Sequence, residues 1–284
     1  VHSGEAEGHR AAHGGKRATE PALQLPGRPF TARGRTVSGP GILRPALALL
    51  YPRRCPFCDG VLGLCTRCEA CEKEAAALRL PVPRLAVEPS RVSELAAGDH
   101  HFGRLAGAAA LYRYKGCVRT AVLRMKNGGR ACYAGYFAAE LAQAVFGCTL
   151  AQKRGIITLK TPPPLARFDL VTPVPTARGG ARGYNPPDRL AKPLAAYLQT
   201  PCEPRALQKS RRTEKQEGKN ARERLENVRG AFTAQPALAE GRRVLLVDDV
   251  ITTGATAAAC AEALLRAGAL EVFAVSVAET PLSS

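Results

Sequence analysis

The most informative segment of the chain reads Val244-Leu245-Leu246-Val247-Asp248-Asp249-Val250-Ile251-Thr252-Thr253-Gly254-Ala255-Thr256. It opens with four apolar residues in a row, a pattern typical of a strand buried on both faces of a parallel sheet. Two aspartates and a threonine-rich turn follow. The alanine-rich run 257–266 then predicts a helix that ends near Gly268. The segment therefore predicts a strand, an acidic pair, a turn and a helix, in that order.

This order indicates a site for a phosphorylated sugar. Ligands of open parallel sheets bind beyond the carboxyl ends of the strands. The start of a helix offers backbone N–H groups and the positive end of the helix dipole, which both suit a phosphate. Glycine lets the backbone approach closely, and threonine hydroxyls add donors. We therefore predict that a phosphate is bound by Thr252, Thr253, Gly254, Ala255 and Thr256.

The two aspartates need a different target, because carboxylates beside a phosphate would repel it. We predict that Asp248 and Asp249 face ribose hydroxyls or a Mg²⁺ ion, which prefers oxygen ligands. In the plainer alternative they only cap a buried strand, which leaves the threonine-rich turn unexplained. The segment is not a Walker loop, since no Gly-Lys-Thr or Gly-Lys-Ser follows the turn.

Composition narrows the class of partner. With 284 residues, 45% of them hydrophobic, the chain is long enough for one sizeable domain and an appendage. The net charge of +17 favours acidic partners such as nucleotides, phosphate esters or nucleic acid. Aromatic residues make up 5% and Trp is absent, which weakens a model of single-strand binding by stacking. No apolar run approaches the ~20 residues of a membrane span, and a signal-peptide core is missing. We therefore expect a cytoplasmic protein without membrane insertion.

Ten cysteines are present, and five of them fall between Cys55 and Cys71. Such clustering favours a metal site over a disulfide scaffold. Two Cys-x-x-Cys pairs can supply four thiolates to a tetrahedral zinc ion. The predicted ligands are Cys55, Cys58, Cys65 and Cys68, with Cys71 as an alternative to Cys68. Because these thiolates would fill all four positions, we expect the zinc to be structural.

The chain is predicted to have three parts. Residues 1–40 are rich in Gly, Ala, Arg and His without periodicity, which predicts disorder. Residues 41–83 combine a short apolar helix with the four-cysteine zinc module. Residues 84–284 form the main α/β domain, and within it residues 148–166 are expected to be a surface insertion.

Two basic segments in the main domain could meet an anionic ligand. The Gly- and Arg-rich loop at 176–185 follows a strand and can present N–H groups and guanidinium forks to a diphosphate. Residues 205–229 hold nine Lys or Arg and four Glu. A charge run is usually a solvated face, but this one precedes the 244–247 strand, where a hood over a phosphate site would lie. The residues of this basic hood are Arg211, Arg212, Arg222 and Arg224.

The motifs, taken in order, resemble the ComF family of phosphoribosyltransferase-like proteins, which are associated with DNA uptake in naturally competent bacteria. The segment 244–256 itself resembles the phosphoribosyl-pyrophosphate (PRPP) signature of type I phosphoribosyltransferases. The two cysteine pairs and the motifs Tyr112–Gly116, Leu123–Gly129 and Pro173–Pro175 also carry the resemblance. One departure is Asn185-Pro186-Pro187, where the family usually has Asn-Gln.

The resemblance implies a type I phosphoribosyltransferase-like α/β fold, a mostly parallel sheet flanked by helices, with a small N-terminal zinc module of four cysteines. It implies that Asp248 and Asp249 are catalytic residues that hold ribose hydroxyls, directly or through magnesium. Residues 252–256 would bind the 5-phosphate, and the diphosphate would lie against Thr176, Ala177 and Arg178.

The function implied is binding of PRPP or a nucleotide with Mg²⁺ in natural competence, with phosphoribosyl transfer to an unidentified acceptor. The alternative is a non-catalytic accessory that binds single-stranded DNA and a DNA-uptake helicase.

Overall fold

The computed structural model describes residues 52–63, 65–81, 105–127, 130, 132–153, 156–163, 168–176, 185–210, 228 and 230–280. The chain divides into two units, Val1–Pro45 and Ala46–Ser284, and every described residue lies in the second. The predicted disordered segment 1–40, the predicted helix at 42–51 and the four arginines of the basic hood lie outside the described residues.

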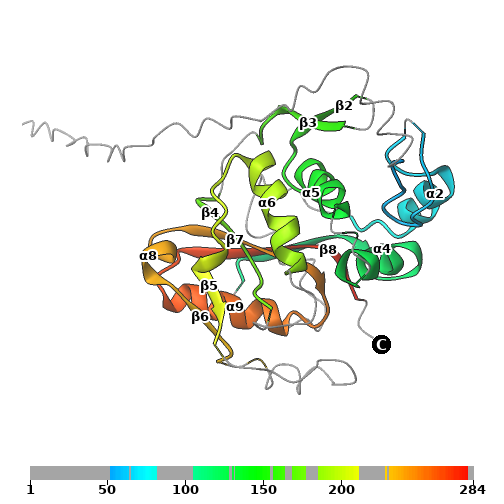
Figure 1. Cartoon of the computed structure of the whole chain (residues 1–284). Coiled ribbons are helices and arrows are strands. Elements are labelled where there is room, and N and C mark those ends of the chain that lie inside the picture. The colour runs from blue at the N-terminus through cyan, green and yellow to red at the C-terminus, as the bar shows by residue number, and fades with distance from the viewer. Residues whose placement is uncertain are drawn as a thin grey trace, which may run out of the picture. The chain divides into compact units, whose positions relative to one another are not determined.

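The centre of the second unit is a four-stranded sheet in the order β1-β8-β7-β4, and all three pairings are parallel (Figure 1). Its strands are β1 (Gly107–Arg113), β4 (Leu170–Pro173), β7 (Arg243–Ile251) and β8 (Glu271–Glu279). The strand predicted at 244–247 is therefore central. It continues to Ile251, so Asp248 and Asp249 lie within the strand rather than after it.

Helices and a short antiparallel pair cover the two faces of this sheet (Figure 1). One face carries three helices: α4 (Gly116–Asn127), α5 (Tyr133–Ala144) and α6 (Pro186–Leu198). The other carries α9 (Ala255–Arg266) and the pair β5 (Leu207–Lys209) and β6 (Phe232–Ala234). The predicted sheet flanked by helices is thus confirmed.

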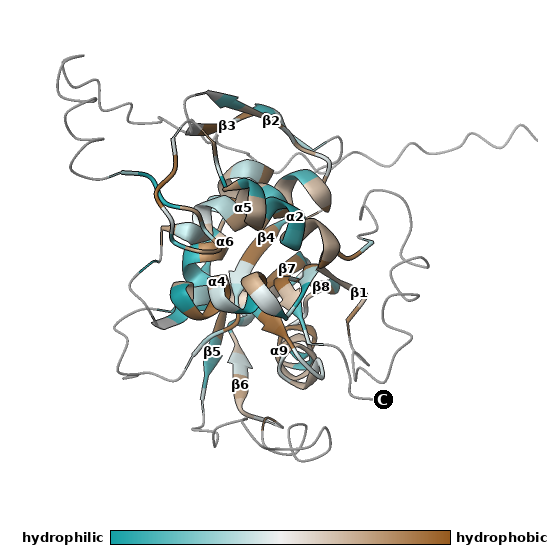
Figure 2. Cartoon of the chain, turned by 90° about the vertical axis from the view of Figure 1, so that its right-hand side faces the viewer, coloured by the Kyte–Doolittle hydropathy of each residue, from teal (hydrophilic) through white to brown (hydrophobic). Residues whose placement is uncertain are grey.

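The side chains of β7 alternate between two cores. Leu245 and Val247 pack on the α5 and α6 side, while Val244 and Leu246 pack on the α9 side. All four are fully buried. Because both faces are covered, the strand has no polar face, which explains its unbroken apolar run. In Figure 2 the strands of the sheet are accordingly largely brown, the colour of hydrophobic residues.

The segment 148–166 has more structure than an irregular insertion. It contains an antiparallel hairpin of β2 (Thr149–Lys153) and β3 (Ile156–Thr161). Leu150 and Leu159 pack against the core beside α5. The hairpin was not predicted, because its alternating pattern is short and mostly polar.

The unusual Asn185-Pro186-Pro187 sequence forms the start of α6. Both prolines occupy the first helical positions, where a missing backbone N–H costs nothing. Asn185 is extended, as a residue before proline prefers. Its Nδ2 donates to the carbonyl of Val174 at 3.0 Å, so the helix start is tied to the end of β4.

Three short elements complete the described part: α2 (Glu69–Ala77), the 3-10 turn η1 (Pro204–Ala206) and α8 (Pro236–Ala239). Within the described ranges, none of the helices has the length and apolar character needed to cross a membrane.

Replacing Leu246 by Ala should test the central position of β7. The side chain is fully buried, and loss of a buried leucine with the cavity that it leaves costs about 2–5 kcal/mol. Urea unfolding followed by circular dichroism measures this loss. Leu270→Ala is the matched control, since Leu270 is 67% exposed and should change stability by less than about 0.5 kcal/mol. Equal effects of the two changes would contradict the assignment.

Candidate functional site

The acidic pair lies at the carboxyl end of β7, with its two side chains on opposite faces of the sheet. Side chains alternate along a strand, so Asp249 points to the same side as Val247, toward α4. There the Lys126 Nζ atom lies 2.8 Å from Asp249 Oδ1. Asp248 points to the α9 side, and its Oδ1 accepts a hydrogen bond of 2.8 Å from the Asp249 backbone N–H.

Lys126 is the site residue that the sequence analysis missed. It lies in the last turn of α4, and its ion pair with Asp249 is largely shielded from water, with side-chain exposures of 26% and 7%. Burial opposes the ammonium charge, but Asp249 and Asp248 outweigh this and raise the pKa of Lys126. The sequence motif Leu123–Gly129 contains this lysine, but sequence does not say which strand end the lysine reaches.

The same surroundings raise the pKa of Asp248 toward neutral pH. Burial, followed by the negative charge of Asp249, raises the pKa of Asp248 to about 7. The positive charge of Lys126 acts in the opposite direction. Near neutral pH, Asp248 is therefore part protonated and ready to change its charge when a ligand or cation arrives.

The threonine-rich turn connects β7 to α9. Gly254 is the N-cap of α9 with φ 77°, in the left-handed region that favours glycine. Thr253 is buried, and its Oγ1 accepts a 3.4 Å hydrogen bond from the Ala255 N–H, so it shapes the turn. Thr252 and Thr256 are partly exposed. The start of α9 thus presents an N-terminal helix end beside the acidic pair, as anion binding requires.

The end of β4 lies directly beside the end of β7. Pro173 pairs with Val247, and the Val174 N–H donates to the Val247 carbonyl at 2.9 Å. The exposed Thr176 follows within a few residues. The segment that leads into the predicted diphosphate loop therefore starts beside the end of β7. Its other predicted members, Ala177 and Arg178, lie outside the described residues.

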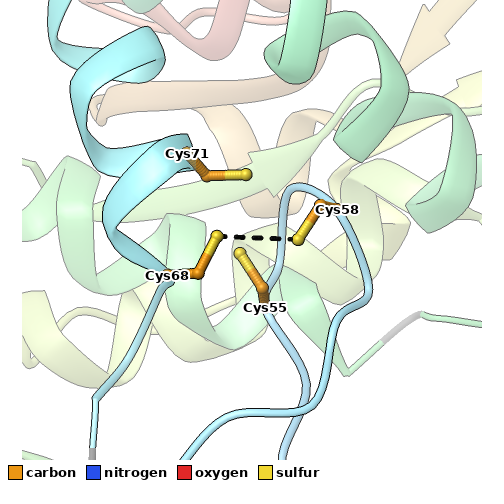
Figure 3. Close-up of side chains that lie close together, drawn as sticks. All are labelled: Cys55, Cys58, Cys68 and Cys71. Atoms are coloured by element: carbon orange, nitrogen blue, oxygen red, sulfur yellow. Dashed lines mark hydrogen bonds between the residues drawn. The ribbon is translucent and has the colours of Figure 1, made fainter.

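A second cluster consists of four cysteines (Figure 3): Cys55, Cys58, Cys68 and Cys71. Their Sγ atoms all lie within 4.8 Å of one another, and those of Cys58 and Cys68 are 3.7 Å apart. A tetrahedral zinc with Zn–S bonds of about 2.3 Å would hold its sulfurs about 3.8 Å apart. The four cysteines could hold a metal ion, and this geometry suits a structural zinc.

One predicted ligand needs correction, because Cys71 and not Cys65 completes the cluster. Cys68 is the N-cap of α2 and Cys71 lies in its first turn, so the helix brings the two thiols together. A backbone hydrogen bond involving Cys71 lowers the pKa of Cys68 to about 7, which favours the thiolate. Cys65 is exposed. The sequence contains two overlapping Cys-x-x-Cys pairs, and only the start of α2 selects between them.

The cysteine cluster also anchors the helix that carries Lys126. Glu74, on the same helix as Cys71, accepts a 2.8 Å hydrogen bond from the Cys117 N–H at the start of α4. Near the other end of α4, the Arg124 guanidinium donates to the carbonyl of Phe57, which lies between Cys55 and Cys58. Both halves of the cysteine module thus support the helix that reaches Asp249.

Comparison with known families identifies the main domain. Residues 189–282 match the family "Phosphoribosyl transferase domain", and this range contains the acidic pair, the turn and α9. This part of the chain is therefore similar to phosphoribosyl transferase domains. The type I phosphoribosyltransferase fold, with a parallel sheet, flanking helices and a cysteine cluster near the N-terminus, is thereby confirmed.

Curated proteins that are similar to this chain have names that refer to DNA utilization or competence. DNA utilization protein YhgH of Escherichia coli O157:H7 is 40% identical over 91 residues, which cover 32% of this chain and 40% of that protein. Competence protein F of Haemophilus influenzae is 35% identical over 108 residues, covering 37% and 47%. The chain thus spans less than half the length of the curated relatives that it matches. These homologues confirm the resemblance to the ComF family over the aligned part.

A solved structure also matches part of the chain. Glutamine PRPP amidotransferase from B. subtilis, complexed with ADP and GMP, shows 22% identity and a TM-score of 0.32. The match covers 51% of this chain and 26% of that one. This likeness is too weak to bear on the site.

Metal content should distinguish the two cysteine assignments. Cys71→Ser removes a buried member of the four-sulfur cluster, so we expect protein purified without chelators to lose most of its bound zinc. Cys65→Ser is the matched control and should retain about one zinc per chain, because Cys65 lies outside the cluster. Inductively coupled plasma mass spectrometry measures both. Zinc lost from Cys65→Ser but kept in Cys71→Ser would overturn the corrected ligand set.

Replacing Lys126 by Met should raise the pKa of Asp248 above 7, because the ammonium now lowers that pKa. Carboxyl ¹³C NMR over a pH series measures it. Since the folded pKa already exceeds that of an unfolded aspartate, ionisation of Asp248 destabilises the fold as pH rises from about 4 to about 7. The drop in the free energy of unfolding between about pH 4 and about pH 7 should therefore be larger in Lys126→Met than in wild type. We expect a difference of about 1–3 kcal/mol in urea unfolding at neutral pH.

The exposed Lys115, directly before the first residue of the same helix, supplies the control for this change. Lys115→Met should leave both the Asp248 titration and the unfolding curve unchanged. An Asp248 titration that is identical in Lys126→Met and wild type would show that the ion pair does not set this pKa.

Proposed function

We propose that this protein binds PRPP, or a nucleotide with the same ribose 5-phosphate group, together with Mg²⁺ at the carboxyl ends of β4 and β7. The observation that supports this most is the juxtaposition of Asp248 and Asp249 with the Gly254-capped start of α9. We further propose a role in DNA uptake or utilization, which the names of the relatives support.

In the proposed complex, the 5-phosphate lies at the start of α9. Backbone N–H groups of the first helical turn donate to its oxygens, and the helix dipole stabilises its charge. Thr252 and Thr256 are partly exposed and add hydroxyl donors. Thr253 is buried, and its hydroxyl accepts a hydrogen bond that shapes the turn.

The ribose and the cation lie against the acidic pair in this proposal. Asp248 and Asp249 would hold Mg²⁺ or the ribose hydroxyls, and bound Mg²⁺ would supply positive charge to the diphosphate. Asp249 would then exchange its contact with Lys126 for the ligand. The released ammonium would lie near the negative diphosphate. Thr176, Ala177 and Arg178 are the proposed diphosphate contacts, and the basic hood of Arg211, Arg212, Arg222 and Arg224 is proposed to supply further positive charge.

Phosphoribosyl transfer is the reaction that this arrangement would serve. The bond from the anomeric carbon to the diphosphate oxygen breaks, and the acceptor nucleophile forms the new bond to the same carbon. Positive charge develops on the ribose ring, and an ionised Asp248 or Asp249 on the ribose face stabilises it. Lys126 and the basic loop stabilise the departing diphosphate.

A second candidate is a non-catalytic accessory that binds single-stranded DNA and a DNA-uptake helicase. The net charge of +17 favours it, because basic surfaces attract the phosphate backbone. The name of the Haemophilus relative, competence protein F, agrees with such a role.

Isothermal titration with PRPP and MgCl₂ tests the proposed site. Wild-type protein should give a saturable heat signal. The double variant Asp248→Asn, Asp249→Asn should bind at least ~100-fold more weakly, because each lost hydrogen bond to a charged group costs about 1.5–3 kcal/mol. Affinity should rise from about pH 6 to about pH 8 as Asp248 ionises. Asp169→Asn is the matched control, because Asp169 lies at the opposite end of the strands, beside Arg243.

The two candidates give different results in the same series. An absence of heat with wild-type protein would refute the PRPP site. Binding of an oligonucleotide that survives the double aspartate change and weakens with salt would support the accessory role. Release of diphosphate with any acceptor base would support the transferase.

A further inference from the structure

A pocket lies away from the acidic pair, where the cysteine module meets α5, α6 and β3. Its volume is ≈ 400 Å³, within the range of about 300–1,000 Å³ typical of small-ligand sites. It shares no lining residue with the turn, the acidic pair or Lys126. The residues that line it come from 52–66, 130–136, Ile157 and Tyr197.

The polar lining of this pocket is cationic. Arg53, Arg54 and Arg130 all line it, and its described lining contains no Asp or Glu. Each guanidinium is a planar fork of N–H donors that matches phosphate oxygens in pairs. Three such forks around one cavity of this size favour a ligand with a phosphate group.

Asp59 holds these groups in place from behind the pocket wall. Its Oδ2 accepts from Arg130 Nη2 at 2.9 Å, and its Oδ1 accepts from the Tyr133 hydroxyl. Its backbone carbonyl accepts from Arg54 Nη1 at 2.9 Å. Asp59 thus orients three lining side chains, and the net charge of these lining arginines and Asp59 stays positive. Asp59 does so at φ 65°, a left-handed backbone conformation that few side chains adopt.

The remaining wall is aromatic and apolar. Tyr133, Tyr136 and Tyr197 line it together with Ile157. The Tyr136 ring is fixed by edge contacts to Phe57 and Phe137 at 5.9 and 5.3 Å between centroids. A fixed aromatic wall suits a flat ring, and such stacking does not depend on which base is present.

We propose that this pocket binds a nucleoside phosphate, with the phosphate on the three arginines and the base against the tyrosines. Such a group is presented either by a free mononucleotide or by the phosphorylated end of a nucleic acid strand. The site is separate from the proposed PRPP site, so the protein would hold two phosphorylated ligands at once.

The test uses the full chain with Asp248→Asn and Asp249→Asn, so that the PRPP site is disabled. Equilibrium dialysis with AMP should show saturable binding in this background. Adding Arg130→Gln should weaken it by roughly tenfold or more, as expected for a lost charge-assisted hydrogen bond. Arg119→Gln, at an exposed arginine of α4, is the matched control and should change it less than about twofold. Zinc content reports that each variant is folded.

An oligonucleotide probe and protection of cysteines from alkylation test the proposal further. AMP and a 5′-phosphorylated oligonucleotide are compared. If only the oligonucleotide binds, and Arg130→Gln weakens its binding, the site is assigned to the phosphorylated end of a nucleic acid strand. AMP should protect Cys132 and Cys65, which line the pocket and are exposed, from alkylation detected by mass spectrometry. The proposal fails if neither probe binds, if Arg130→Gln and Arg119→Gln weaken binding equally, or if inorganic phosphate binds as tightly as AMP.

Discussion

The parallel pairing of β7 between β8 and β4 is the constraint from which the rest of the molecule follows. It buries Val244–Val247 on both faces, which requires a helical layer on each side. It also places the carboxyl ends of neighbouring strands at one edge, so that residues distant in sequence meet there. Because a strand alternates its side chains, Asp248 and Asp249 are directed to opposite faces. The acidic pair is therefore two different groups, one beside α9 and one held by Lys126.

The contact between Lys126 and Asp249 links the sheet edge to the cysteine module. Helix α4 carries Lys126, and hydrogen bonds with Glu74 and Phe57 join that helix to both halves of the cluster. Cys55 and Phe57 share one hydrophobic core with residues of β7 and β8. A metal in the cluster would therefore stabilise the position of the ammonium beside the acidic pair. This gives the module a physical role in the site even though it contributes no side chain there.

The local sequence pattern predicted those features that depend only on residues close together in the sequence. The apolar run, the glycine turn and the alanine-rich helix were predicted and lie where expected, because each depends on periodicity or on backbone preference, whereas the acidic pair lies inside the strand instead of after it. Pattern was insufficient for the hairpin at 149–161, whose alternation is short. It was also insufficient for Asn185-Pro186-Pro187, a departure from the family pattern that forms the start of α6.

The sequence alone predicted the buried parallel strand and the presence of a cysteine cluster from local periodicity and motif spacing, and it predicted the fold class through the family resemblance that its motifs carry. Three features were settled by packing in three dimensions. Cys71 replaces Cys65 because α2 begins at Glu69 and turns Cys68 and Cys71 to the same side. Lys126 meets Asp249 because the last turn of α4 lies beside that strand end. The arginine-lined pocket exists only where the cysteine module, α5 and α6 come together. Contacts between distant segments depend on how whole elements pack, and no local pattern encodes them.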